Sequence, residues 1–225
     1  MIGVFDSGVG GICAYNHVRA ALSSKDIVYL ADRKNAPYGT KTEDEILKFT
    51  KNNIRALKNL GAEVILIACC SASTVYERLN EEEKAISIPI ITPAARAAAE
   101  TGERIAVIAT RHTARSGAFG REIARFSDAT VCEMAEQGLV ALVEGGNRDG
   151  RVSEECQAYL TAMTKRIKEA EADTLILGCT HFSHLEGEIK RLLPDVRIIS
   201  PARVGAEELI KRIKSSRENG KITYI

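Results

Sequence analysis

The chain has 225 residues, 45% of them hydrophobic, which is enough for a packed core in one large domain or two small ones. Its 31 Lys and Arg nearly balance its 30 Asp and Glu, so no overall charge favours nucleic acid or an anionic membrane as a partner. The first residues, MIGVFDSGVGG, lack the features of a signal peptide, and no run approaches the roughly 18 apolar residues of a membrane span. We therefore expect a soluble cytoplasmic protein with no nucleic-acid or membrane partner.

Short apolar runs rich in Ile and Val alternate with helical patterns along the chain. Several runs lack polar alternation, as do strands that are buried on both faces of a parallel sheet. The predicted strands are IGVF (2–5), IVYLA (27–31), VILIA (64–68), IPII (88–91), IAVIA (105–109), ATVCEM (129–134), TLILG (174–178) and VRIIS (196–200). The alternation of strands with helices predicts an α/β fold.

Helix signals lie between these runs. Thr42 and Glu45 form a capping-box pattern at the start of one helix. Ser153, followed by acidic residues, begins another that is expected to run to about Ala172. A last helix includes residues 207–213.

The predicted strands divide into two sets of four with the same order of parts. In the first set, Asp6 and Ser7 follow the first strand and Cys69 follows the third. In the second set, Thr110 and Cys179 hold the equivalent positions. Ligands of open parallel sheets bind beyond the carboxyl ends of the strands. Two facing halves are therefore expected to gather these side chains around one crevice.

Two thiols on opposite sides of a substrate suggest proton transfer rather than a single covalent attack. One, as a thiolate, removes a proton from one face of a carbon, and the other, as a thiol, delivers a proton to the opposite face. Cysteine suits this role because neighbours and helix N-termini can lower its pKa from about 8.5. Asp6 is the candidate partner of Cys69, and His181, with Glu144, is the candidate partner of Cys179. The pattern favours a two-base racemase or epimerase.

Simpler interpretations compete with this one. A cysteine that ends a buried strand is often only a small hydrophobic residue. The DSGVGG segment could be read as a phosphate loop, but it matches neither GxGxxG nor a Walker motif. The adjacent Cys69 and Cys70 could form a redox switch, although adjacent cysteines rarely close a disulfide without strain. The joint occurrence of the parts at equivalent strand ends favours the catalytic interpretation.

Motifs of one known family run across nearly the whole chain in the family's order. The matching stretches are IGVFDSGVGG (2–11), YLADRKNAPYGTK (29–41), IACCSAS (67–73), PAARAA (93–98) and LILGCTHF (175–182), with looser matches at 106–119 and 142–146. On these residues the chain resembles glutamate racemase, of the cofactor-independent aspartate/glutamate racemase superfamily. DSGVGG, PYG and GCTH are specific together, whereas each alone is a weak signal.

The resemblance implies two similar parallel-sheet α/β domains related by pseudo-two-fold symmetry, with the active site in the cleft between them. The expected N-terminal domain comprises residues 1–92 and about 205–225, and the second comprises residues 93–204. The implied reaction interconverts L- and D-glutamate and supplies D-glutamate for peptidoglycan, and hence for the cell wall and cell shape. The resemblance also implies that no cofactor or metal is needed. Racemases of this kind often dimerise, so a homodimer is included among the expectations.

The resemblance also assigns roles to single residues. Carried over by motif, Cys69 acts on one face of the α-carbon and Cys179 on the other. Asp6 supports Cys69, while His181 and Glu144 support Cys179. The residues expected to bind the substrate are Asp6, Ser7, Tyr38, Gly39, Cys70, Ser71, Thr180 and His181.

The chain departs from the family pattern next to the first catalytic cysteine. The family reads Ala-Cys-Asn-Thr where this chain reads ACCS (68–71). Cys70 thus replaces an amide with a poor donor, a loss on the order of 1–3 kcal/mol for one substrate contact. Three alternatives therefore stay open: a racemase of another small acid such as aspartate, a racemase-like binding protein with weak activity, and a one-thiol lyase or decarboxylase. The presence of both Cys69 and Cys179 argues against the last.

Overall fold

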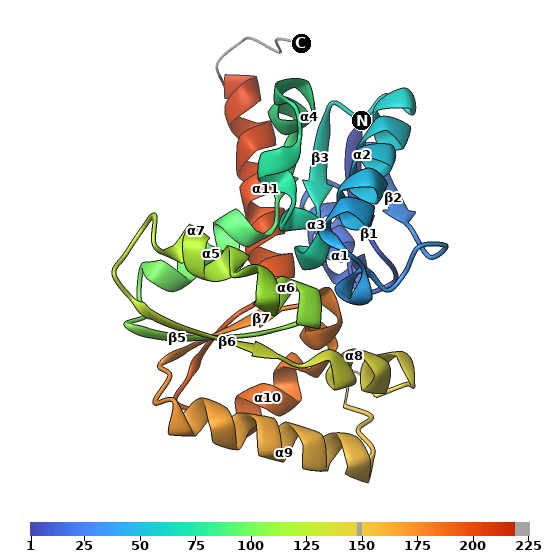
Figure 1. Ribbon diagram of the computed structural model, residues 1–225. Helices are drawn as coiled ribbons and strands as arrows, with labels where there is room; N and C mark the ends of the chain where they lie inside the picture. The colour runs from blue at the N-terminus through green and yellow to red at the C-terminus, as the bar shows by residue number, and fades with distance from the viewer. Residues whose placement is uncertain (148–149, 219–225) are drawn as a thin grey trace.

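Two four-stranded parallel sheets form the framework of the protein (Figure 1). The computed structural model describes residues 1–147 and 150–218. The first sheet has the order β2-β1-β3-β4, from β1 (Ile2–Asp6), β2 (Ile27–Ala31), β3 (Val64–Ile67) and β4 (Ser87–Pro89). The second has the order β6-β5-β7-β8, from β5 (Arg104–Ala109), β6 (Thr130–Ala135), β7 (Thr174–Gly178) and β8 (Arg197–Ile199). Corresponding strands hold corresponding places, so the predicted α/β fold with two similar halves is confirmed.

Burial explains why the central strands carry unbroken apolar runs. Every residue of β1 and β7 is buried, because each strand pairs with neighbours on both sides and helices cover both faces. The predicted run 88–91 is too long at its end, since β4 ends at Pro89 and Ile91 already begins a helix. Pro93 lies in the first turn of that helix, where the missing N–H costs no hydrogen bond.

Helices connect the strands and begin where their capping residues predict. Thr42 Oγ1 accepts from the Glu45 N–H, and the Glu45 carboxylate accepts from the Thr42 N–H, which is the predicted capping box. Ser153 Oγ likewise accepts from the Cys156 N–H, but the helix that it caps ends at Glu169 rather than near Ala172. The helices are α1 (Ile12–Ala21), α2 (Glu43–Asn59), α3 (Cys70–Ser73), α4 (Glu81–Ile86), α5 (Ile91–Ala99), α6 (Arg111–Ser116), α7 (Ala118–Ile123), α8 (Gln137–Glu144), α9 (Glu154–Glu169), α10 (Glu186–Leu192) and α11 (Pro201–Glu218), with 3-10 helices η1 (Tyr38–Thr40), η2 (Tyr76–Arg78) and η3 (Thr180–Leu185).

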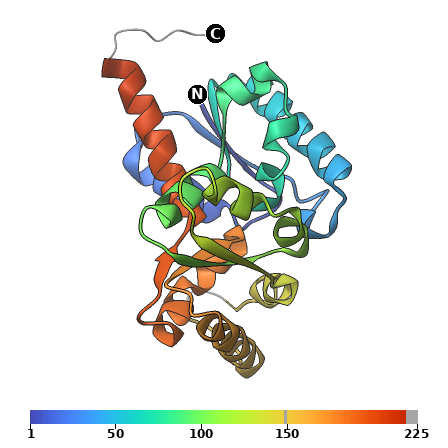
Figure 2. The same cartoon turned by 60° about the vertical axis from the view of Figure 1, so that its left-hand side comes forward.

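The last helix returns from the second half of the molecule to the first (Figures 1 and 2). α11 follows β8 but packs against α1 and α5, and Leu209 is fully buried in the core that also contains Val4 and Leu66. This packing agrees with assigning the end of the chain to the N-terminal domain. The domain boundaries themselves stay a prediction, and residues 219–225 lie outside the described part of the chain.

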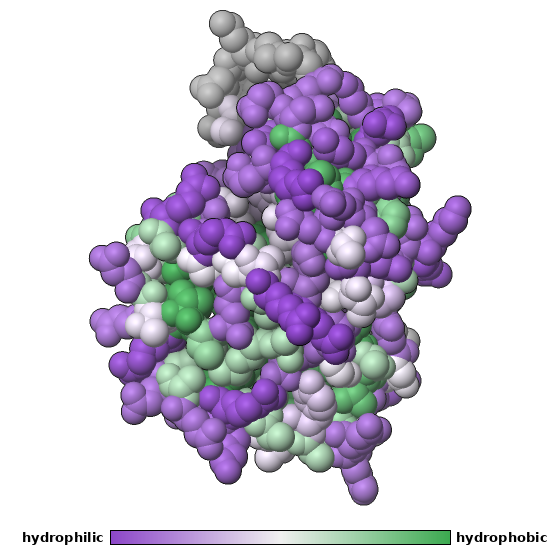
Figure 3. All heavy atoms as spheres, viewed as in Figure 1, coloured by the Kyte–Doolittle hydropathy of each residue, from purple (hydrophilic) through white to green (hydrophobic). Residues whose placement is uncertain are grey.

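Figure 3 shows one face of the protein. Hydrophilic residues cover most of its upper part, and hydrophobic residues gather in its lower part between hydrophilic side chains. Among the residues that the structure describes, the large apolar side chains that are exposed are Val9, Leu60 and Phe126. Within residues 1–147 and 150–218, no helix combines the length and the apolar composition that crossing a membrane requires.

Candidate active site

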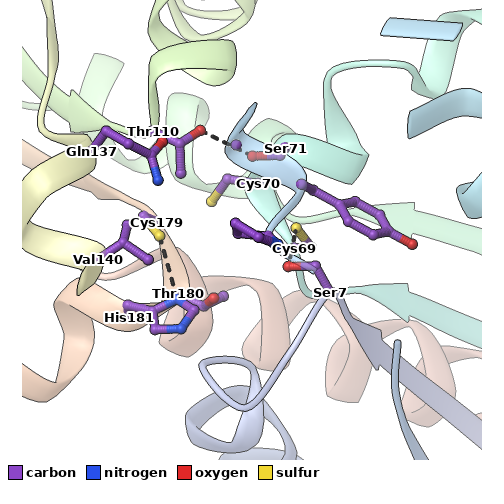
Figure 4. Close-up of a pocket in the computed structure, with 13 residues that line it drawn as sticks. Ser7, Cys69, Cys70, Ser71, Thr110, Gln137, Val140, Cys179, Thr180 and His181 are labelled. Carbon is purple, nitrogen blue, oxygen red and sulfur yellow. Dashed lines mark hydrogen bonds between the residues drawn. The ribbon is translucent and has the colours of Figure 1, made fainter. Parts of the chain in front are cut away.

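One pocket lies between the two halves, beyond the carboxyl ends of their strands (Figure 4). Both sheets contribute to its wall, through the loops that follow β1, β3, β5 and β7 and through η1 and α8. Its lining residues are Ser7, Pro37, Tyr38, Gly39, Cys69, Cys70, Ser71, Thr110, Gln137, Val140, Cys179, Thr180 and His181. The cavity measures ≈ 20 Å³, room for about one water molecule, so its walls must separate to admit an amino acid.

Cys69 occupies the side of the pocket that belongs to the first sheet. It follows β3 and directly precedes α3, and its side chain is 5% exposed. Its Sγ lies 3.5 Å from Ser7 Oγ, which follows β1. Parallel pairing of β1 with β3 brings these two strand ends together, which is why residues far apart in sequence meet here.

Cys179 occupies the opposite side, which belongs to the second sheet. It follows β7 and precedes η3, and its Sγ lies 3.7 Å from His181 Nδ1. The other ring nitrogen, Nε2, lies 3.3 Å from Glu144 Oε1 at the end of α8. That contact has ion-pair distance but not the alignment of a hydrogen bond. In the view of Figure 4, Cys70 lies between Cys69 and Cys179.

Asp6 connects the two sides from behind the pocket. It is fully buried, its Oδ2 accepts from the Gly8 N–H at 2.9 Å, and its Oδ1 accepts from Thr180 Oγ1 at 3.2 Å. Two glycines of DSGVGG permit this packing. A Cβ at Gly10 would lie 2.5 Å from Thr180 Oγ1, and one at Gly11 would lie 2.5 Å from Asp6 Cβ. Gly10 thus permits close packing of the first loop against the second half of the site, and Gly11 permits close packing against Asp6.

Burial governs the acidity of the thiols. Burial, together with the negative charge of Asp6, raises the pKa of Cys69 to about 12, although hydrogen bonds from Ser7 and Ala72 act to lower it. Burial likewise raises the pKa of Cys179, against a backbone hydrogen bond from His181 that lowers it. The expectation that helix N-termini lower both pKa values is therefore wrong for this state. The turns that follow the cysteines are short, and desolvation outweighs them.

On another side of the pocket, the two halves contact each other through hydroxyl groups and a glycine. We call this contact, formed by Ser71, Gly39, Thr110 and Thr113, the seam. Ser71 Oγ lies 3.0 Å from the hydroxyl oxygens of both Thr110 and Thr113. A Cβ at Gly39, in η1, would lie 2.6 Å from the Thr110 Cβ and 2.8 Å from Gln137 Oε1. The absence of a side chain at Gly39 therefore lets η1 close against the second half.

We expect Gly39→Ala to force the halves apart. Overpacking of this kind costs about 1–3 kcal/mol, so the free energy of unfolding should fall by that amount in urea denaturation. Turnover should fall with it, because the pocket wall includes both sides of the contact. Gly187→Ala is the matched control, since nothing lies within 4 Å of a Cβ there. Equal stabilities of the two variants would contradict this account.

The structure brings the predicted site residues together. Ser7, Gly39, Ser71 and most of the others line the pocket, while Asp6 and Glu144 contact lining residues from behind. Tyr38 lines the pocket, but its hydroxyl donates to Asp32 Oδ2 at 2.6 Å. The hydroxyl therefore stabilises the first half of the protein through this hydrogen bond. The roles of all these residues stay predictions at this point.

Pro37, Gln137 and Val140 also line the pocket, and the sequence analysis missed them. The position of Gln137 in the sequence could have indicated a place in the pocket. It lies shortly after β6, a strand that holds the same place in its sheet as β2 does in the other. Val140 is an ordinary apolar residue of an amphipathic helix, with no sequence feature to set it apart. Among the described residues, no group of three or more His, Cys, Asp or Glu could hold a metal ion.

The fold and the pocket together define a class of protein: an α/β protein of two similar halves with a thiol from each half at a shared cleft. Comparison with known proteins agrees. The model of the Asp/Glu/hydantoin racemase family matches residues 14–209. The chain is 36% identical over 220 residues to a glutamate racemase of Gloeobacter violaceus, covering 96% of this chain and 82% of that protein.

Solved structures give the same result. The crystal structure of glutamate racemase from Francisella tularensis in complex with D-glutamate matches with a TM-score of 0.87 at 28% identity, covering 96% of this chain and 81% of that one. That of the isoform RacE1 from Bacillus anthracis matches with a TM-score of 0.86 at 29% identity, covering 96% and 82%. The chain belongs to the Asp/Glu/hydantoin racemase family. The predictions of the family and of an isomerase are thereby confirmed.

Proposed function

We propose that this protein interconverts L- and D-glutamate by proton transfer at the α-carbon, with Cys69 serving one face and Cys179 the other. The observation that supports this most directly is that both thiols line one pocket from opposing sheets. Relatives that cover most of the chain are glutamate racemases, which supports glutamate as the substrate. Racemisation of this type needs no electron transfer and no group carrier.

The substrate itself can supply the charge that the thiols need. In the free protein, burial keeps both sulfurs protonated at neutral pH, because their pKa values are raised. An α-ammonium group bound beside a buried sulfur favours its anionic form by Coulomb attraction. One cysteine passes its proton to the neighbouring Asp6 or His181 and, as a thiolate, removes the α-proton, while the other thiol gives its proton to the opposite face of the α-carbon. Asp6 and His181, each next to one thiol, are placed to assist these transfers.

Hydroxyl groups around the pocket suit a substrate with two carboxylates. Ser7 and Ser71 line it, and each hydroxyl can donate to a carboxylate oxygen, whereas the Thr180 hydroxyl already donates to Asp6. We further propose that the D-glutamate formed supplies peptidoglycan synthesis, and thus cell-wall formation and cell shape. A homodimer, a cytoplasmic location and the lack of nucleic-acid partners remain predictions.

Exchange of the α-proton with solvent tests the proposal. Incubation with L-glutamate in heavy water should give D-glutamate that carries deuterium at the α-carbon, as measured by chiral chromatography with mass spectrometry. L-aspartate serves as the parallel substrate. Faster turnover of aspartate than of glutamate would favour the alternative acid, and no exchange with either acid in a folded protein would favour a binding protein.

Replacing Cys70 with asparagine tests the departure from the family pattern. Cys70 is buried in the pocket wall, and its thiol is a poor donor to a carboxylate. We expect Cys70→Asn to raise kcat/KM for glutamate by roughly tenfold, as one added hydrogen bond of about 1.4 kcal/mol implies. Cys70→Ala, which adds no donor, is the control. If the asparagine variant turns over no faster than the alanine variant, the missing amide does not limit this enzyme.

A further inference from the structure

A buried carboxylate outside the pocket holds the junction between β6 and α8. Glu136 is 1% exposed, and it precedes α8 directly, yet its side chain makes no capping hydrogen bond to its own helix. Its N–H donates to the Ala109 carbonyl at 2.7 Å, at the end of β5. Burying a carboxylate costs free energy unless the group is paired, so its partners indicate what the residue does.

Both side-chain partners of Glu136 come from α9. Tyr159 donates its hydroxyl to Oε2 at 2.8 Å, and Arg166 Nη2 lies 2.8 Å from Oε1 as an ion pair without hydrogen-bond alignment. Tyr159 and Arg166 are seven residues apart, two turns along one face of the helix. Burial and Glu136 raise the pKa of Tyr159 to about 12, so its hydroxyl keeps its proton at neutral pH.

A glycine brings α8 against the same tyrosine. A Cβ at Gly138 would lie 3.0 Å from Tyr159 Cε2 and 3.2 Å from its hydroxyl oxygen. The ring of Tyr159 therefore lies against the first turn of α8 while its hydroxyl holds Glu136. Two independent contacts, one polar and one steric, thus fix the start of α8 on α9.

The helix that this cluster holds presents side chains to the catalytic cleft. Gln137 and Val140 line the pocket, and Glu144 at the far end reaches His181 Nε2 at 3.3 Å. His181 in turn contacts Cys179. An α-helix of eight residues spans about 12 Å as a rigid unit, so a shift at its first residue moves its last.

We propose that Glu136, Tyr159 and Arg166 are positioning residues that set α8 so that Glu144 and His181 support Cys179. The inference rests on the proposed racemisation, because it assigns the cluster to one of the two proton-transferring thiols. Cys69 belongs to the first sheet, and its side-chain partner Ser7 follows β1. The cluster therefore acts more on the face of the substrate that Cys179 serves than on the other.

Tyr159→Phe and Arg166→Gln test the proposal without leaving a carboxylate wholly unpaired, since each removes one partner of Glu136. We expect kcat to fall by about tenfold in each, with KM changed less than threefold, as small misplacements of catalytic groups produce. Initial rates of deuterium uptake should fall unequally for the two enantiomers, more for the one whose proton Cys179 removes. The stereochemical assignment comes from the exchange that remains in Cys69→Ser and Cys179→Ser.

A second measurement does not depend on turnover. Alkylation by iodoacetamide, followed by peptide mass spectrometry, should become about threefold faster at Cys179 and change less at Cys69, since Val140 of α8 belongs to the same buried cluster as Cys179. Arg191→Gln is the matched control for Arg166→Gln, because Arg191 also pairs with a buried carboxylate, that of Glu188. Tyr76→Phe, which removes a tyrosine hydrogen bond in the first half, is the control for Tyr159→Phe.

Failure of this proposal is distinct from failure of the proposed function. If the unaltered protein exchanges no α-proton, racemisation is wrong, and the alkylation of Cys179 still decides whether the cluster positions that thiol. Equal loss at both faces, or unchanged alkylation of Cys179 in both variants, would overturn the positioning role. Equal effects in the control variants would also overturn it, because they would indicate general destabilisation.

Discussion

Serine in place of either Cys69 or Cys179 should lower racemisation by on the order of 10³-fold or more, because general acid–base groups contribute about 10²–10⁴-fold and a hydroxyl is a far weaker acid than a thiol. The two losses should differ in kind. The thiol that remains can still exchange the proton of the enantiomer it faces with solvent deuterium. Cys69→Ser and Cys179→Ser should therefore exchange opposite enantiomers without inversion.

The control for this experiment is Cys132→Ser, because Cys132 is exposed on β6 and does not line the pocket. It should retain full activity and label both enantiomers. Circular dichroism should show all three variants folded. Exchange of the same enantiomer by both catalytic variants would mean that a single base serves both faces, and the two-base mechanism would be wrong.

Asparagine at position 6 should produce two changes of opposite sign. Activity should fall by about 10²–10³-fold, since a carboxylate that is placed for proton transfer is lost. Alkylation of Cys69 at pH 8 should become about tenfold faster, because the negative charge of Asp6 is one cause of the raised pKa of that thiol. A lower pKa leaves more thiolate at a given pH, so the thiol gains reactivity while the enzyme loses catalysis.

The asparagine fits the same packing. Its amide can accept from the Gly8 N–H and donate to Thr180 Oγ1, so the contact between the halves is kept. Asp44→Asn is the control, because Asp44 is exposed and pairs with Arg78 at the surface. The role given to Asp6 would be refuted by full activity of Asp6→Asn, and slower alkylation of Cys69 would refute the electrostatic account.

The sequence predicted much of the candidate site because many of the side chains that line it follow strand ends. Runs such as VILIA and TLILG indicate buried strands, and parallel strands place their carboxyl ends at one edge. Cys69 and Cys179 were therefore expected at one cleft before any contact was known. Gln137 and Val140 escaped notice because their place in the pocket depends on how α8 lies, which no local pattern encodes.

The protonation of the thiols also lay beyond the sequence. A cysteine before a helical turn suggests a lowered pKa, but the structure buries both sulfurs, and desolvation outweighs the few N–H groups of short turns. Burial depends on how the two halves close on each other. The short residues where the halves meet, Gly39 and Gly10 among them, permit a closure whose extent only the packed structure reveals.

By itself, the sequence determined the α/β class, the doubled order of strands and the pair of cysteines, because hydrophobic periodicity and strand-end chemistry are local properties. Only the tertiary structure decided that Asp6 and Thr180 meet across the cleft and that Glu136 ties α8 to α9. These contacts join residues far apart in the chain. Their distances depend on how whole elements pack, and a linear sequence does not state the distances between elements.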